Sequence, residues 1–201
     1  PKGTPLQNRI DQGEDVDKAS GGIFNTDSGA PVKAQYKVSE NERAIFGPGG
    51  TSIVLGSDKS VGPASGFGGD GVTGIASPGS GKVDIVVGRM ASARGGKGVE
   101  AGTFVDNSFP ADAARIYVCE TTNVDLNFGL VEGLVGNARG KSAVAVKADG
   151  VRIIGREGIK LVTGAMNNVR GYPSGEPNSK GGKLDAAPGI DLIASNNSSP
   201  Y

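Results

Sequence analysis

Glycine limits this chain to folds that are built from short elements and many turns. The sequence contains 35 glycines and 11 prolines among 201 residues, and each interior glycine costs a helix about 1 kcal/mol relative to alanine. Long helices are therefore not expected. The glycines follow no Gly-X-Y register, which excludes a collagen-like triple helix. The composition favours an all-β fold of short strands joined by Gly-rich turns.

Seven short segments have the pattern of β-strands. Each is rich in β-branched and aliphatic residues and is bounded by Gly, Pro, Asn or Asp, as strands between turns are. One short helix is expected near residues 127–131, in a loop between two of these segments. The expected strands are residues 52–55, 82–87, 115–118, 143–147, 151–154, 159–162 and 190–193.

Two octads repeat without a gap at residues 149–156 and 157–164. They share the order acid, glycine, β-branched, base, aliphatic, aliphatic, small residue. Because the aliphatic residues alternate with Arg152 and Lys160, one face of each strand would be apolar and the other charged. We expect two consecutive strands, either as a hairpin in an ordinary sheet or β-sandwich, or as successive rungs of a β-helix. In both cases the apolar face needs a cover, which a trimer packed around an axis would supply.

The first part of the chain has a different composition. Residues 1–43 contain few apolar side chains, three prolines and an acidic cluster, so this segment cannot bury enough apolar surface to offset its ordering entropy. We expect an extended N-terminal arm over residues 1–43. The β-rich domain is expected over residues 44–201, with the octad repeat at residues 149–164.

Charge and residue usage exclude several functions. Lys plus Arg equals Asp plus Glu at 21 each, which argues against the basic surface of a nucleic-acid-binding protein. The absence of histidine rules out a His-containing catalytic triad within this chain and removes a common zinc ligand. No run approaches the ~20 apolar residues of a membrane helix. We therefore expect a non-enzymatic protein with no catalytic, cofactor-binding or metal-binding residue, and neither nucleic acid nor membrane as a partner.

Three motifs that suggest chemistry fit structural roles better. Residues 77–82 resemble a phosphate-binding loop, but Val83 follows the lysine where Ser or Thr is required, and a strand comes next. Cys119 lies in an expected strand and is interpreted as a small apolar filler rather than a reactive thiol. The basic residues Arg89, Arg94 and Lys97 are interpreted as a solvated face.

A carbohydrate-binding or carbohydrate-cleaving module is an alternative from another functional class. Such a module would expose aromatic rings, and the candidates are Phe67, Tyr117, Phe128 and Tyr172. Six aspartates could include a carboxylate pair or a calcium site, although no Asp-x-Asp-x-Asp-Gly run indicates an EF-hand. These are Asp84, Asp106, Asp112, Asp125, Asp149 and Asp191.

The run 144–163, which spans most of both octads, resembles the virion structural proteins of large tailed bacteriophages. Residues 50–56, 83–89 and 189–194 share this resemblance, which covers roughly residues 44–195. The octads also resemble the Gly-punctuated repeats of triple-stranded β-helices in phage spikes and secretion-system tips. The resemblance implies a component of a particle, so no catalytic residue is carried over from it.

From this resemblance we expect a trimer that is made in the host cytoplasm and located in the virion. It would decorate or cement the capsid, with the major capsid protein as a partner and the arm running over adjacent subunits. The alternative is a tail spike or baseplate component of the same kind of particle. Two departures from the spike pattern favour the capsid surface, since only two octads are contiguous and no histidine is present to hold a metal at a spike apex.

Overall fold

The computed structural model describes residues 34–47, 50–57, 80–100, 102–164, 175–184 and 189–197. The chain divides into two units between Val32 and Lys33, eleven residues before the expected boundary. Residues 1–33 of the expected arm lie outside the described residues. The described residues form mostly strands and two short helices, which confirms the all-β class.

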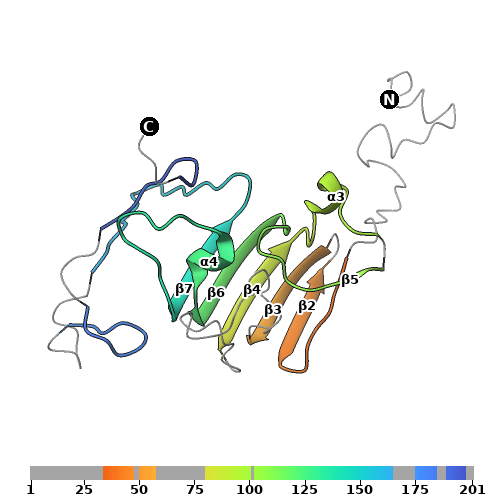
Figure 1. The fold of residues 1–201 in the computed structure, drawn as a ribbon, viewed down its shortest axis with the longest axis horizontal. Helices are drawn as coiled ribbons and strands as arrows, with labels where there is room; N and C mark the ends of the chain where they lie inside the picture. The colour runs from red at the N-terminus through yellow and green to blue at the C-terminus, as the bar shows by residue number, and fades with distance from the viewer. Residues whose placement is uncertain are drawn as a thin grey trace, which may run out of the picture. The chain divides into compact units, whose positions relative to one another are not determined.

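A five-stranded antiparallel sheet forms the larger part of the described fold. Its strand order, β2-β3-β4-β6-β7, follows the order along the chain, and Figure 1 shows the five arrows side by side from β7 at one edge to β2 at the other. The smaller sheet contains two parallel strands, β1 (Gln35–Tyr36) and β5 (Phe104–Val105). The five strands are β2 (Glu42–Gly47), β3 (Thr51–Ser57), β4 (Gly81–Val87), β6 (Ala114–Thr122) and β7 (Lys141–Lys147).

Four of the seven expected strands are confirmed as β3, β4, β6 and β7. The strands expected at residues 151–154, 159–162 and 190–193 are not formed. A strand needs a hydrogen-bonded neighbour, and among the described residues no backbone–backbone hydrogen bond outside the strands and helices involves residues 150–162. The predicted hairpin of octads within one chain is therefore wrong. The expected arm also ended too late, because β1 and the start of β2 lie before residue 44.

The expected short helix is present as α4 (Val124–Phe128), about three residues earlier than predicted. The side chain of Asn123 accepts a hydrogen bond from the Leu126 amide at the N-terminus of α4, which satisfies one otherwise free donor. Gly129 ends the helix in the left-handed conformation at φ 64°, where glycine carries no steric cost. The other helix, α3 (Ala93–Gly96), is a single irregular turn with Arg94 at φ 54°. Neither described helix has the length and apolarity needed to cross a membrane.

The hydrophobic core lies against one face of β6. Phe109 and Tyr117 pack edge to face with ring centroids 5.1 Å apart, and the Phe128 ring of α4 lies 4.8 Å from the Phe109 ring. Cys119 belongs to the same buried cluster, which confirms its interpretation as a small filler. This core is small for a chain of this length, and many large hydrophobic side chains elsewhere are exposed.

Candidate functional site

The two faces of the five-stranded sheet differ in chemistry in an unusual way. The covered face buries charged and polar side chains alongside apolar ones such as Val54 and Val86, whereas the uncovered face carries aliphatic ones. On β4, for example, Lys82 and Asp84 are buried while Val83 and Ile85 are exposed. Charged residues are rarely fully buried unless they are paired, so the partners of the buried charges decide what this face can do.

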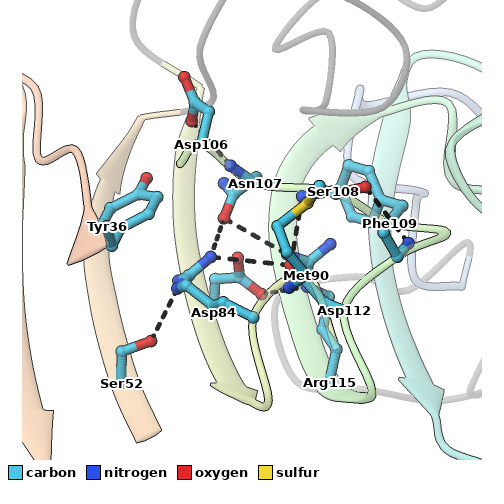
Figure 2. Close-up of polar contacts among 12 residues, drawn as sticks. Tyr36, Ser52, Asp84, Met90, Asp106, Asn107, Ser108, Phe109, Asp112 and Arg115 are labelled. Atoms are coloured by element: carbon cyan, nitrogen blue, oxygen red, sulfur yellow. Dashed lines mark hydrogen bonds and ion pairs between the residues drawn. The ribbon is translucent and has the colours of Figure 1, made fainter. Parts of the chain in front are cut away.

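The buried charges form a closed cluster that we call the charged cluster. It consists of two acids, two arginines and one amide, all at most 5% exposed. They come from β4, β6 and the connection between these strands, and Figure 2 shows Asp84, Asn107, Asp112 and Arg115 converging. The members are Asp84, Arg89, Asn107, Asp112 and Arg115.

Arg115 is the centre of the charged cluster. Its Nε lies 3.0 Å from Oδ1 of Asp84, and its Nη2 donates to Oδ2 of Asp112 at 2.6 Å. Arg89 donates to Oδ1 of Asn107 at 2.7 Å, an atom that Arg115 also reaches at 3.3 Å. Asp112 in addition accepts from the Met90 amide at 2.8 Å. The cluster thereby fastens the connection between β4 and β6 onto the sheet.

A second buried pair joins β2 to β4 beside this cluster. Nζ of Lys82 lies 3.1 Å from Oε1 of Glu42, and the Tyr36 hydroxyl donates to the same oxygen at 2.7 Å. The Ser39 amide donates to the other carboxylate oxygen at 3.0 Å. Burial by itself would raise the pKa of Glu42, but these hydrogen bonds and the Lys82 charge lower it to about 2. Glu42 therefore stays charged at neutral pH.

The charged cluster has the properties of a structural network rather than a catalytic one. Burial raises the pKa of Asp84 and lowers the pKa of Arg89, while their oppositely charged neighbours act in the other direction. The charges of two aspartates and two arginines cancel. A general acid or base must come within hydrogen-bond distance of a substrate, and these buried groups have no such access from solvent.

The uncovered face of the sheet carries two rows of residues that run across all five strands. One row pairs Ile45 with Ile53, Ile53 with Ile85, Ile85 with Ile116 and Ile116 with Val146. The second row begins at Arg43 on β2 and is aliphatic on the other four strands. We call this surface the aliphatic face. Its members are Ile45, Ile53, Leu55, Val83, Ile85, Val87, Ile116, Val118, Val144 and Val146, all between 37% and 69% exposed.

The segment after β7 is also unusually exposed. Every residue from 148 to 164 is exposed, including the octad residues Ile154 at 86% and Val162 at 82%. The later segment 189–197 is held by polar contacts instead. Asp191 accepts hydrogen bonds from the amides of Leu134 and Val135, at 2.8 Å and 2.9 Å. The octads thus have the alternation of strands, yet their aliphatic side chains face solvent.

The structure separates most of the residues singled out as possible ligands. Asp84 and Asp112 both contact Arg115, but the other four aspartates lie at separate places, where Asp125 and Asp191 accept backbone hydrogen bonds. No group of three or more His, Cys, Asp or Glu within the described ranges could hold a metal ion. The predicted solvated face is wrong for Arg89, which is buried, whereas Arg94 and Lys97 are exposed.

The aromatic residues suggested for sugar binding form no exposed platform where they are described. Tyr117 is fully buried, and Phe128 is half-buried against it. Phe67 and Tyr172 lie outside the described residues, as do residues 77–79 of the phosphate-loop-like run 77–82. Lys82 of that run contacts Glu42 rather than an open loop.

An open depression of about 500 Å³ lies where β2 and β3 meet at Glu42 and Gly56. Among the described residues that line it there is no Ser, Thr, Cys or Lys that could act as a nucleophile. The lining residues are Glu40, Asn41, Glu42, Arg43, Leu55 and Gly56.

The sequence does not by itself reveal that the aliphatic face is exposed and available for contacts. The signal was present, because aliphatic residues alternate with polar ones on β3, β4 and β6. Such alternation normally marks the aliphatic side as the core, and here that side is uncovered.

Comparison of the chain with models of protein families, with curated protein sequences and with solved structures finds no match.

Proposed function

We propose that this chain is a non-enzymatic structural subunit of a tailed-bacteriophage particle that decorates or cements the capsid as a trimer. The phage assignment rests on the resemblance of residues 144–163 and related segments to virion structural proteins. The proposed partners are other copies of the chain and the major capsid protein. The proposed N-terminal arm, expected over residues 1–43, would run over adjacent subunits.

The aliphatic face is the observation that carries the structural role. Soluble monomers rarely expose contiguous apolar patches above a few hundred Å², and larger patches mark interaction sites. Here such a patch extends over all five strands of the main sheet. The buried charged cluster on the opposite face supports the non-enzymatic part of the proposal, because its acids and arginines are paired with one another away from solvent.

A tail spike or baseplate component of the same kind of particle is the second candidate. Residues 148–164 favour it, because they carry the octad repeat in a fully exposed segment without strand pairing inside the chain. Rungs of a triple-stranded β-helix would supply the missing hydrogen bonds from other copies. Two contiguous octads would form a short shaft at most, so we place the capsid surface first.

Copy number in purified particles tests the proposal. Quantitative mass spectrometry of particles should find hundreds of copies for a capsid decoration protein and a handful for a tail component. Absence of the chain from the particles would contradict both candidates. A low-resolution map of the intact particle would then show where the corresponding density lies.

A further inference from the structure

We infer that the aliphatic face is the contact surface between copies of this chain, with the face of one copy packed against the same face of its neighbours. This inference deepens the proposed function and rests on it for the existence of an assembly. The proposed surface is the aliphatic face of the five-stranded sheet, and the proposed partner is the same sheet in a second copy of the chain.

The face is chemically suited to a permanent contact. Its two rows contain directly opposed aliphatic side chains, as in the pairs Ile53–Ile85 and Val83–Val118. The nearest charges on this side of the sheet are at its margin, with Arg43 on the edge strand and Glu120 beyond the second row. Obligate interfaces between copies are more apolar than transient ones and resemble a core that has been cut in half.

The size of the face matches a second sheet better than a smaller partner. Five strands at ~4.8 Å spacing and about five residues at ~3.3 Å per residue give a flat area of roughly 400 Å². Side-chain relief makes the accessible area larger, so it approaches the ~800 Å² that each partner contributes to a standard interface. A single helix or an extended peptide would cover part of the width, whereas another twisted sheet packs face to face about 10 Å away.

A separate observation indicates that the missing partners are copies of the chain. The octad segment continues directly from β7, the strand that contributes Val144 and Val146 to the aliphatic face. Its own aliphatic side chains, such as Ile153 at 72% exposed, are also uncovered. Among the described residues each copy therefore has two adjoining uncovered features, and a symmetric assembly would cover both from the same neighbours.

The purified full chain, without any particle, tests the inference. Light scattering should give a mass of at least two 20.2 kDa chains, because sheets that pack face to face require two copies. Ile85→Lys, at the centre of the face, should reduce the mass to that of one chain. Leu134→Lys is the matched control, because Leu134 is 98% exposed outside the sheet, and it should leave the mass unchanged.

Two outcomes of this measurement would overturn the inference. One is a single-chain mass for the wild-type protein, which would mean that another protein or another segment of the chain covers the face. The other is an Ile85→Lys variant that folds and keeps the assembled mass. Near-ultraviolet circular dichroism of the Phe109–Tyr117–Phe128 cluster reports folding, because these rings lie on the opposite side of the sheet.

Thiol labelling gives a readout that does not depend on breaking the assembly. Native Cys119 is buried, so a maleimide reports on a thiol introduced by Ile85→Cys or by Leu134→Cys. In the assembled protein, labelling at position 85 should be at least tenfold slower than at position 134, and denaturant should abolish the difference. Equal rates in the native protein would contradict the inference. Because no particle is used, this result is independent of whether the chain is found in virions.

Discussion

Arg115 shows how a single side chain can compensate buried charges inside a small β-sheet protein. The guanidinium contacts Asp84 and Asp112 and also lies 4.4 Å above the Phe109 ring. Replacing a buried ion pair with apolar residues can be neutral, but removing one partner leaves an uncompensated buried charge. Each member of the charged cluster is therefore expected to be sensitive to single substitutions.

Substitution of Arg115 tests the contribution of the charged cluster to stability. We expect Arg115→Ala to lower the free energy of unfolding by about 3–5 kcal/mol, because two buried carboxylates lose their partner. Arg94→Ala removes an arginine from the exposed pair with Glu100 and should cost at most about 1 kcal/mol. Urea unfolding followed by circular dichroism measures both. Similar losses for the two variants would show that the cluster is not a stabilising network.

Glu42 makes the free energy of unfolding depend on pH. Its pKa is lowered from 4.5 to about 2 in the folded chain, so its contribution is present above the unfolded pKa and is lost as the pH falls toward the folded value. Glu42→Gln should therefore be less stable than wild type at neutral pH. The difference in urea midpoint should narrow between pH ~4.5 and ~2.

A matched substitution separates this effect from general acid sensitivity. Glu40 lies two residues away and is exposed, so Glu40→Gln should follow the wild-type pH profile. A stability gap between wild type and Glu42→Gln that stayed constant down to pH ~2 would contradict the role given to Glu42.

Among the elements, the segment 189–197 depends on polar contacts with the loop after α4. Besides the two amide bonds accepted by Asp191, the Asn196 side chain accepts from the Val131 amide and donates to the Gly129 carbonyl, at 2.9 Å and 2.8 Å. The segment that contains the expected strand 190–193 is thus attached by side chains to backbone groups. It does not add a strand to the sheet.

Asp191→Ala should release this segment without unfolding the sheet. We expect faster hydrogen exchange at the amides of Leu134 and Val135, which lose their acceptor, while amides of β4 and β6 keep their protection. Asp149→Ala, in the exposed segment after β7, is the control and should change neither region. Hydrogen exchange read by mass spectrometry distinguishes the two variants, and unchanged exchange at 134 and 135 would contradict the attachment.

The strands that could be predicted from the sequence carry their signal locally. β3, β4, β6 and β7 are predictable because β-branched residues alternate between glycine-rich turns. The helix is expected over residues 127–131, across the Gly129 that in the structure ends α4. β2 was missed because it begins with Glu42 and Arg43, so its first residues had the composition of the polar arm. β1 and β5 have two residues each, too few to form a pattern.

The charged cluster could not be predicted, because its partners come together through the fold. Asp84 and Arg115 occupy alternate strand positions that normally face solvent, and Asn107 and Asp112 lie in a connection without periodicity. Their burial depends on how that connection folds back over the sheet. The prediction of strands in the two octads is wrong for a related reason. Their residues alternate as in strands, but strand formation requires a neighbouring strand, and no described strand pairs with them.

At the scale of the whole molecule, the two faces of the sheet predict how an assembly responds to salt. The aliphatic face carries its charges at the margin, so ion pairs contribute little to a contact made through its centre. Screening weakens exposed ion pairs as the Debye length falls from ~10 Å at 0.1 M to ~3 Å at 1 M. Salts that are excluded from protein surfaces instead strengthen apolar burial.

We therefore expect the mass of the assembled protein to stay unchanged when sodium chloride is raised from ~0.1 M to ~1 M. Ammonium sulfate should lower the concentration at which assembly is half complete, since it favours burial of apolar surface. Light scattering over a dilution series measures both effects. Dissociation on addition of sodium chloride would indicate that charged margins, rather than the aliphatic face, hold the copies together.

The strand order of the large sheet has a consequence for how the protein is made. Because β2, β3, β4, β6 and β7 pair in chain order, each copy can complete its sheet through contacts between consecutive strands, which favours rapid folding. Meeting another copy is a later, bimolecular event whose rate depends on concentration. Between these two events the finished sheet is exposed to every apolar surface in the cell, and such exposure promotes aggregation. The yield of correctly joined subunits should therefore depend on how quickly newly folded copies find one another.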